Sequence, residues 1–397
     1  MKRVIGTTIR SLRTPVFKNG DNIKKIIYDV LIEASNQGNF KIQENDILAI
    51  TESVVARTQG NYATVDQISN DINKKFKNFE NVGIIFPILS RNRFSILLKA
   101  IAKSFKKVVI QLSYPSDEVG NSLFNDELLF EKNINPYTDC LNETEYRNAF
   151  GYQKHKFTGI DYIQYYRNIV ESVGSEAVFI FSNKADDILK YTNNIISCDI
   201  HTRFKTKKIL KNLGATIFGL DEILTESIDN SGYNKEYGLL GSNKATEDSV
   251  KLFPRDTNKL VNELQEMIFE YTGKKIEVII YGDGAFKDPV GKIWELADPV
   301  VGVAYTSKLQ GTPNELKLKY LADEKFSSLK GDELKNAILS EINNKNSNLT
   351  ANESSEGTTP RQLADLIGSL CDLTSGSGDK GTPVVYIQGY FDNYANE

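Results

Sequence analysis

The sequence contains few of the side chains from which many catalytic centres are built. Its 397 residues include 2 histidines, 3 cysteines and 1 tryptophan. Two histidines exclude a histidine-rich metal cage or an HExxH zinc site, and three scattered cysteines exclude a disulfide framework or a cysteine zinc cluster. The GxSxG elbow and the P-loop motif GxxxxGK(S/T) are also absent. Catalysis would therefore use carboxylates, lysine, arginine, backbone amides or a hard metal ion.

Long hydrophobic runs are absent as well. No run approaches the roughly 18 apolar residues that a membrane helix needs, and the basic start MKRVIGTTIRSLRTP lacks the apolar segment of a signal peptide. The formal net charge of −4 disfavours binding to duplex nucleic acid, because that binding depends on neutralising phosphates. We therefore expect a soluble, cytoplasmic protein whose partners include neither nucleic acid nor a membrane.

The residues that are present predict packed cores in a mixed α/β fold. Hydrophobic residues make up 40% of the chain and charged residues 25%, and at about 100–200 residues per domain the length predicts two or three domains. Alternating patterns fill residues 1–121, with helices expected over 21–34 and 94–106 and strands over 46–51, 82–88 and 107–112. Strand, helix, strand is the order of a crossover unit in a sheet.

The rest of the chain divides into two further parts. Residues 122–251 continue the strand and helix series, and we interpret them as an inserted α/β domain or a second domain. Residues 252–397 begin with a helix expected over 256–272 and a strand over 276–281, and they end with a helix over 362–373 and a strand over 384–390. Thr312-Pro313 and Thr359-Pro360 each open a capping-box pattern, which predicts a helix start at both places.

Two aspartates follow predicted strands, where ligand sites in α/β sheets tend to form. Asp117 lies in the segment YPSDEVGN and Asp283 in the segment YGDGAFKDP. Together they could hold Mg²⁺ or Mn²⁺ beside nucleotide phosphates, because these ions often use one or two protein carboxylates. The alternative is that aspartate simply favours turns and caps.

Other motifs are less informative. Residues 376–381 match GxGxxG, but the expected order is helix, glycines, strand, which excludes the NAD fingerprint. A backbone-amide nest with Lys380 as a point charge, or a flexible connection, remain the two interpretations. His201 and Trp294 are expected in cores, and the basic run 203–211 is expected on a solvated helix face.

Taken in order, these segments resemble the coenzyme F420-0:L-glutamate ligase family, the GTP-dependent γ-glutamyl ligases of deazaflavin coenzyme synthesis. The resemblance covers roughly residues 1–121 and 252–391. It is carried by the following segments: RTPVFKNGD from 13, DILAITESVVARTQG from 46, LSYPSDEVGN from 112, LFPRD from 252, VIIYGDGAF from 278, and QLADLIGS with PVVYIQGY from 362 and 383. The implied fold is a γ-glutamyl-ligase-like core with an inserted α/β domain, over 1–121, 122–251 and 252–397.

The resemblance also implies roles for individual residues. Metal would be bound by Asp117, Asp283, Gly284 and Ser369. GTP would be lined by Thr14, Pro15, Val16, Phe17, Glu52, Ser53, Arg57 and Asn121, and the catalytic cations would be Arg57 and Lys380. The chain departs from the family where a Ser-Lys pair becomes Glu52-Ser53, where the Asp117–Asn121 segment carries one extra residue, and at Gly284 and Ser369.

The resemblance therefore implies a GTP- and Mn²⁺- or Mg²⁺-dependent enzyme that joins L-glutamate to a carboxylate acceptor, coenzyme F420-0 or a related compound, through an acyl phosphate. A homodimer is expected on the same basis. Two alternatives stay open: a folate γ-glutamyl ligase, and a non-catalytic nucleotide- or ligand-binding protein on the same scaffold.

Overall fold

The computed structural model describes residues 4–77, 79–156, 158–283, 300–349, 352–355, 362–375 and 378–396, except for the side chain of Asp283. These residues form two compact units. Unit 2 is the continuous stretch Gln59–Arg255, and unit 1 is made of the residues described before and after it. Both units combine helices and sheets, so the predicted mixed α/β class is confirmed.

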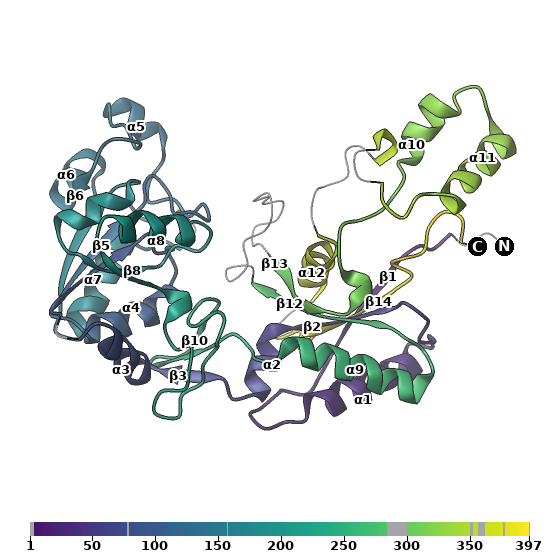
Figure 1. Ribbon diagram of the computed structural model, residues 1–397, viewed down its shortest axis with the longest axis horizontal. Coiled ribbons are helices and arrows are strands. Elements are labelled where there is room, and N and C mark those ends of the chain that lie inside the picture. The colour runs from purple at the N-terminus through teal and green to yellow at the C-terminus, as the bar shows by residue number, and fades with distance from the viewer. Residues whose placement is uncertain are drawn as a thin grey trace. The chain divides into compact units, whose positions relative to one another are not determined.

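Unit 1 is built on a five-stranded sheet (Figure 1). Its strand order is β1 (Thr8–Leu12), β14 (Val384–Gln388), β2 (Ile47–Thr51), β12 (Glu277–Asp283) and β13 (Val300–Tyr305). Only the central pair, β2 and β12, is parallel. The N-terminal segment and the C-terminal strand therefore pair with each other and with the middle of the chain.

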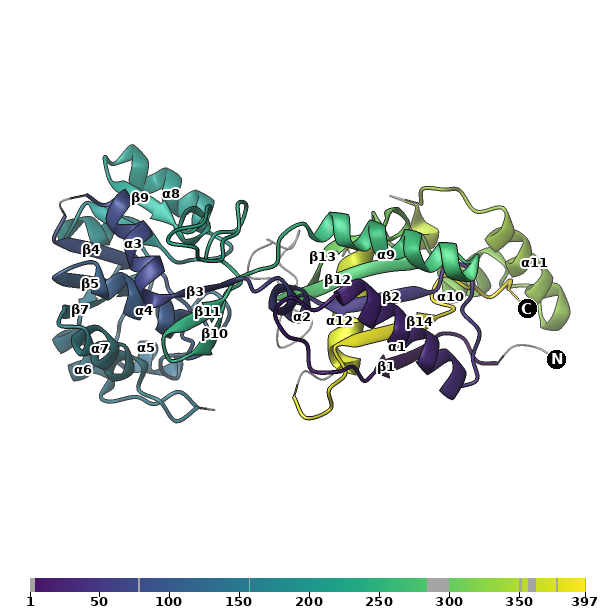
Figure 2. The same ribbon diagram turned by 90° about the horizontal axis from the view of Figure 1, so that it is seen from below.

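Alternating side chains on these strands point to opposite faces of the sheet and belong to two separate cores. Leu48 and Ile50 of β2 face α1 (Ile23–Gln37) and α9 (Thr257–Thr272), whereas Ile47 and Ala49 face α12 (Leu363–Thr374). Figure 2 shows α1 and α9 side by side on one face of the sheet. Full burial of one such side chain contributes about 1.5–3 kcal/mol. The continuous apolar run ILAI is therefore explained by a strand covered on both faces.

Short elements complete unit 1. Helix α2 (Glu52–Thr58) follows β2 directly, and η4 (Ser307–Leu309) follows β13. A helical segment then comprises α10 (Leu318–Tyr320), η5 (Leu321–Lys325), α11 (Gly331–Asn343) and η6 (Glu353–Ser355).

The helix predicted at Thr312-Pro313 is wrong, because residues 312–317 are not helical and the next helix begins at Leu318. Tertiary hydrogen bonds hold this stretch instead: Asn314 Oδ1 accepts from the N–H of Leu349 at 3.0 Å, and Asn314 Nδ2 donates to the carbonyl of Asn346 at 3.0 Å. The second capping box, at Thr359-Pro360, lies outside the described residues, as does Trp294.

Unit 2 contains a doubly wound sheet with strand order β6-β7-β5-β4-β8-β9. Strands β4 (Asn81–Ile85), β5 (Lys107–Leu112), β7 (Glu176–Phe181), β8 (Asn194–Ser197) and β9 (Thr216–Gly219) are parallel, and β6 (Leu141–Asn142) is antiparallel at the edge. The chain starts in the middle at β4, runs to β7, and returns through β8, so the order reverses between β4 and β8. Ligands in open α/β sheets bind at such a point.

Helices connect these strands on both sides. Helices α4 (Phe94–Lys103) and α7 (Tyr162–Ser172) contact each other, with the rings of Phe94 and Tyr166 5.4 Å apart. Helices α8 (Arg203–Asn212) and η1 (Ala185–Lys190) pack against the sheet, where Leu210 and Ile188 join a core of strand side chains. The remaining elements are β3 (Tyr62–Thr64), α3 (Val65–Lys75), α5 (Glu127–Glu131), α6 (Glu143–Phe150), η2 (Leu220–Glu222), β10 (Asn243–Thr246) and β11 (Ser249–Lys251).

The unit boundaries differ from the expected domain boundaries. The first division falls after Thr58 and the second after Arg255, not after residues 121 and 251. The reason is strand pairing: β4 and β5, expected in the first domain, pair with β8 and β7. Whether residues 122–251 are an insertion stays a prediction.

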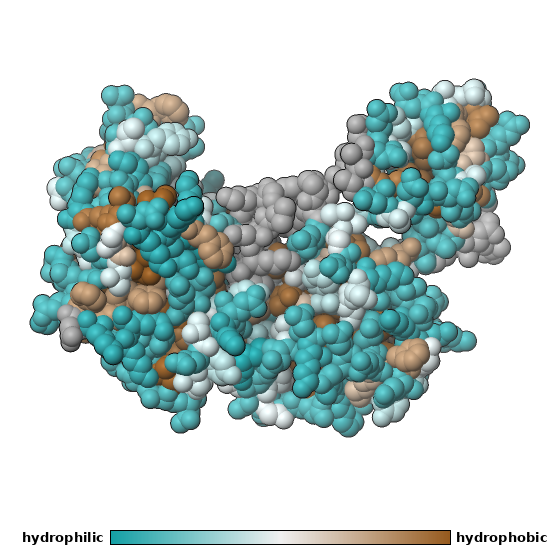
Figure 3. Space-filling view, in the orientation of Figure 1, coloured by the Kyte–Doolittle hydropathy of each residue, from teal (hydrophilic) through white to brown (hydrophobic). Residues whose placement is uncertain are grey.

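The surface and the helices agree with a chain that packs its apolar residues inside. In the view of Figure 3, hydrophilic residues cover most of the visible surface of each unit, and apolar residues form small patches. No helix among the described residues is long and apolar enough to cross a bilayer.

Candidate functional site

Three segments that are distant in sequence meet in unit 1. The N–H of Thr14 donates to the carbonyl of Gly381 at 3.1 Å, which joins the loop after β1 to the loop before β14. Farther along the first loop, the N–H of Gly20 donates to the carbonyl of Thr58 at 2.9 Å, and Arg57 Nε donates to the carbonyl of Phe17 at 3.3 Å. The first loop is therefore fixed between the C-terminal loop and the end of α2.

The residues predicted to line GTP in the first loop have different surroundings. Phe17 is buried at 3% exposure and packs in the same core as Val54 and Val55 of α2. Val16 is 78% exposed, and Pro15 is exposed too. The buried Phe17 thus anchors the loop, and its neighbours are the ones accessible to a ligand.

Helix α2 brings a buried acid to the end of β12. Glu52 follows β2 directly and is 5% exposed. Because β2 and β12 are parallel, with Thr51 opposite Tyr281, Glu52 lies against Gly282: a Cβ added at Gly282 would stand 2.2 Å from Glu52 Cγ. Glu52, which is predicted to line GTP, therefore packs against Gly282, the residue that precedes the predicted metal ligand Asp283.

Ser369 lies at the same end of the sheet. Its hydroxyl donates to the carbonyl of Val300 at 3.3 Å, and Val300 is the β13 residue opposite Asp283. The structure therefore places Ser369 and Asp283 on neighbouring elements. Gly284 and the side chain of Asp283 lie outside the described residues.

Asp117 and Asn121 belong to unit 2 and bind each other. Asp117 Oδ2 accepts from the N–H of Leu89 at 2.8 Å and from Asn121 Nδ2 at 2.9 Å. Its Oδ1 accepts from the N–H groups of Val119 and Asn121, at 3.1 and 2.8 Å. Burial raises the pKa of Asp117, and these donors oppose that rise. A carboxylate offers about four lone-pair sites, so these bonds occupy Asp117.

These observations test how the predicted metal site fits. Within the described ranges, no three His, Cys, Asp or Glu side chains lie together as a group that could hold a metal ion. The carboxylate of Asp117 is engaged by four protein donors. Four donors within the protein thus compete with a divalent ion for Asp117, and its role as a ligand stays a prediction.

A second acid, Glu118, lies at the point where the strand order of unit 2 reverses. Its two oxygens accept from the N–H groups of Ile200 and His201, in the segment between β8 and α8. Burial raises the pKa of Glu118 to about 7; the Ile200 N–H opposes the rise, and the nearby charge of Asp199 adds to it. The sequence analysis missed Glu118, although the segment YPSDEVGN that contains it was selected.

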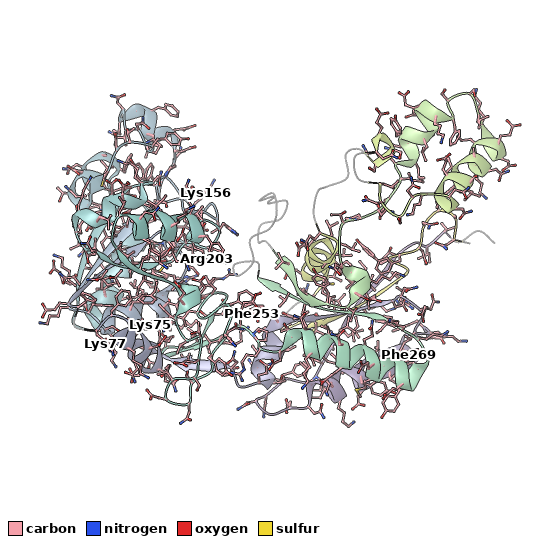
Figure 4. The ribbon with its side chains drawn as sticks, viewed as in Figure 1. Lys75, Lys77, Lys156, Arg203, Phe253 and Phe269 are labelled. Atoms are coloured by element: carbon pink, nitrogen blue, oxygen red, sulfur yellow. The ribbon has the colours of Figure 1, made fainter. Side chains whose placement is uncertain are left out.

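The neighbouring residues are also mutually bonded. Asp199 Oδ2 accepts from the hydroxyls of Thr202 and Thr206, each at 2.7 Å. Arg203, labelled in Figure 4, is buried, and its Nε lies 3.6 Å from Asp221 Oδ2. His201 is buried at 8% exposure, as expected of a core histidine. The basic run 203–211 was expected on a solvated helix face, but two of its residues, Arg203 and Lys207, are buried.

Comparison with protein families decides the relationship of this chain. The family model described as F420-0:Gamma-glutamyl ligase matches residues 11–389. The chain belongs to the F420-0:γ-glutamyl ligase family. The resemblance drawn from the sequence is thereby confirmed. A comparison with curated proteins gave no match.

The F420-0:γ-glutamyl ligase family is a family of ligases, and its members act on small molecules. The match spans both units. Two of the three meeting segments of unit 1 are among those that carried the resemblance, and the third, the loop with Lys380, lies between two others. The structure brings Thr14–Phe17, Glu52–Arg57 and the loop with Lys380 into one region.

The structure adds a cavity of about 860 Å³ in unit 1 that the sequence analysis missed. Its lining includes three basic side chains, Arg10, Arg13 and Lys380. Lys380 was predicted from the glycine-rich motif. Arg10 belongs to no motif, and Arg13 opens the segment RTPVFKNGD without having been assigned a role. The pairing of β1 with β14 brings both near Lys380.

Proposed function

We propose that this chain is a GTP-dependent γ-glutamyl ligase that joins L-glutamate to coenzyme F420-0 or a related carboxylate acceptor. The family match over residues 11–389 carries the proposal. The convergence of the loop after β1, helix α2 and the loop before β14 supports it, because these segments hold most of the residues expected at the nucleotide.

The reaction proceeds in two steps. A carboxylate oxygen of the acceptor attacks the γ-phosphorus of GTP; the bond from that phosphorus to the β–γ bridging oxygen breaks, and GDP leaves. The amine of L-glutamate then attacks the carbonyl carbon of the acyl phosphate, phosphate leaves, and the amine gives up a proton to form the amide. In the first step Arg57 and Lys380, both exposed, neutralise charge on the transferring phosphoryl group, which is the main demand of such a reaction.

Other parts of the proposal have separate support. Arg57 donates a hydrogen bond from its Nε to the Phe17 carbonyl. Within the described part of the chain its two terminal nitrogens are therefore left to contact an anion. Mn²⁺ or Mg²⁺ would supply further charge neutralisation when bound; the side chain of Asp283, one of its predicted ligands, lies outside the described residues. A homodimer is part of the proposal by family resemblance alone, and light scattering of the purified chain tests it.

The test is a ligation assay with purified, intact protein. GTP, L-glutamate and F420-0 are supplied with Mg²⁺ or Mn²⁺, with folate as a second acceptor and ATP as a second nucleotide. We expect glutamate-dependent GDP release and an acceptor heavier by one glutamyl residue. Arg57→Gln is expected to lower kcat by about 10²-fold, whereas Lys319→Gln, an exposed lysine of α10, leaves kcat unchanged.

One observation favours a second candidate, a non-catalytic nucleotide-binding protein: the carboxylate of Asp117 is fully hydrogen-bonded within the protein. A thermal-shift measurement separates the two candidates, because a ligand at 100 times its dissociation constant stabilises by about 2.7 kcal/mol. A GTP-induced shift that survives EDTA, without GDP release on either acceptor, would establish the non-catalytic protein and reject the ligase.

A further inference from the structure

The cavity beside β1 carries an excess of positive charge. We call it the β1 groove; Arg10, Arg13 and Lys380 line it together with one carboxylate, that of Glu33. Glu33 accepts a hydrogen bond from Gln37 Nε2 at 2.8 Å. Among the described residues, no carboxylate lies within salt-bridge distance of any of the three cations. Their charge is therefore available to an anionic ligand.

The cations lie toward different ends of the groove. Arg10 and Arg13 are three residues apart along extended chain, which separates them by about 10 Å. Lys380 belongs to the Arg13 end, because the N–H of Thr14 bonds to the carbonyl of Gly381. The lining is partly apolar, with Leu12, Val30 and Phe40.

Arg10 is held in place before any ligand arrives. Its guanidinium carbon lies 4.2 Å from the centre of the Phe40 ring, and its Nη1 donates to Gln388 Oε1 at 2.7 Å. A guanidinium has five N–H donors, so most of them remain for a ligand. A fixed cation loses less conformational entropy on binding than a free one.

From this arrangement we propose that the β1 groove binds the acceptor of the ligase, and that this acceptor is elongated, with an anionic group, carboxylate or phosphate, at each end. The proposal rests on the proposed function. One anion lies at Arg10. The other, the carboxylate that is to be activated, lies at Arg13 and Lys380, next to the loop from Thr14 that is expected to line the nucleotide. Arg10 is then a specificity-determining residue far from the reacting atoms.

The experiment measures binding without requiring turnover. Equilibrium dialysis gives the Kd of F420-0 for the intact protein and for Arg10→Gln, Arg13→Gln and Lys380→Gln, with Lys319→Gln as the matched control. The GTP dissociation constant is measured on the same proteins. Suberate, which has a carboxylate at each end, and octanoate, which has one, are then used as competitors. Arg10→Lys retains the charge and shows whether a loss in Arg10→Gln is structural.

We expect each groove variant to weaken F420-0 binding about fivefold, as for exposed charge pairs, and we expect Arg10→Gln and Arg13→Gln to leave GTP binding unchanged. Suberate should compete better than octanoate for the native protein, and Arg10→Gln should abolish that difference, with partial recovery in Arg10→Lys. Loss of GTP affinity in place of acceptor affinity would reassign the groove to the nucleotide. F420-0 affinities equal to that of the control, or no binding of F420-0 or suberate to the native protein, would overturn the proposal.

These outcomes are separable from those of the ligation assay. If the native protein ligates glutamate but the groove variants bind acceptor normally, the groove proposal fails and the ligase stands. If the groove binds acceptor in a protein that never releases GDP, the ligase fails and the anion site stands.

Discussion

Glu118 is a partly buried residue whose carboxylate accepts hydrogen bonds from two backbone N–H groups, those of Ile200 and His201. The charges that act on it are those of Asp199 and Asp117. Burial, its largest influence, raises its pKa to about 7 from an ordinary value of 4.5. The folded protein therefore binds more protons than the unfolded chain between these values, and stability falls as pH rises through this window.

Glu118→Gln should remove this pH dependence. Melting temperatures of the intact protein and of the variant are compared at pH 5 and pH 8. The variant should gain about 1–3 kcal/mol relative to the native chain between the two pH values, since 1.4 kcal/mol corresponds to one unit of pKa. Parallel pH profiles for the two proteins would show that Glu118 has an ordinary pKa.

Gly282 is a position where a methyl group has no room. An added Cβ would stand 2.2 Å from Glu52 Cγ, so Gly282→Ala should destabilise unit 1 by about 1–3 kcal/mol, the usual cost of overpacking. Because the obstructing atom is a side chain, Glu52→Ala combined with Gly282→Ala should restore part of the loss.

The control for this experiment is Gly6→Ala, where an added Cβ meets nothing within 4 Å. Thermal melts of the native chain, Gly282→Ala, the double variant and Gly6→Ala measure the loss of stability and its partial recovery. Equal melting temperatures for Gly282→Ala and Gly6→Ala would show that Glu52 does not pack against β12.

At the scale of elements, Asn61 ties β3 to the segment that returns before α9. Its Oδ1 accepts from the N–H of Tyr233 and from Arg255 Nη1, at 3.0 and 2.8 Å. Its Nδ2 donates to the carbonyls of Tyr233 and Phe253, at 3.1 and 2.7 Å; Phe253 is labelled in Figure 4. The amide is fully buried, so all its hydrogen-bonding capacity is used inside the protein.

Asn61→Ala should therefore cost about 2–4 kcal/mol, because it removes four hydrogen bonds from a fully buried position. Asn70→Ala is the matched control: Asn70 is exposed and makes a single side-chain bond, to Asp229 at 2.7 Å. Its expected cost is below about 0.5 kcal/mol. Chemical denaturation of both variants provides the measurement, and similar midpoints would contradict the assigned role of Asn61.

Helix starts show what local sequence can and cannot decide. Asn142 with Glu145, and Thr64 with Gln67, form reciprocal capping boxes in the structure. Thr312-Pro313 has the same local pattern but forms no helix, because Asn314 bonds to residues 346 and 349. A cap contributes about 1 kcal/mol, which several tertiary hydrogen bonds exceed.

At the scale of the whole molecule, unit 2 is a continuous stretch with its own doubly wound sheet. Its two ends are joined to each other: Gln59 Nε2 donates to the carbonyl of Arg255 at 2.7 Å, and the N–H of Arg255 donates to Gln59 Oε1 at 2.9 Å. A chain whose core and end contacts are internal can fold alone.

We predict that the fragment 59–255 is a folded domain. Expressed by itself, it should melt cooperatively and give dispersed amide signals in NMR spectra. A fragment cut at the originally expected boundaries, 122–251, lacks β4 and β5 and should not fold. An unfolded 59–255 fragment, or a folded 122–251 fragment, would reject the division after Thr58.

By itself, the sequence determined the local elements and the family. The strands 47–51, 107–112 and 384–388 and the helices α1, α9 and α12 follow from apolar periodicity, which depends on near neighbours. The family followed from ordered short segments, and the match over residues 11–389 confirms it.

Only the tertiary structure decided which of those elements share a unit and what their side chains do. The role of Asp117 as a metal ligand stays a prediction, but the structure shows a partner that the local pattern does not contain: the N–H of Leu89, 28 residues away, donates to its carboxylate. Strands β4 and β5 were expected in the first domain, yet they pair with β8 and β7, which were expected in the second. Arg10 belongs to no motif and Arg13 had no assigned role, yet the pairing of β1 with β14 places both with Lys380. The reason is physical: strand pairing and hydrogen bonding join residues far apart in the chain, and a local pattern contains no information about the partner.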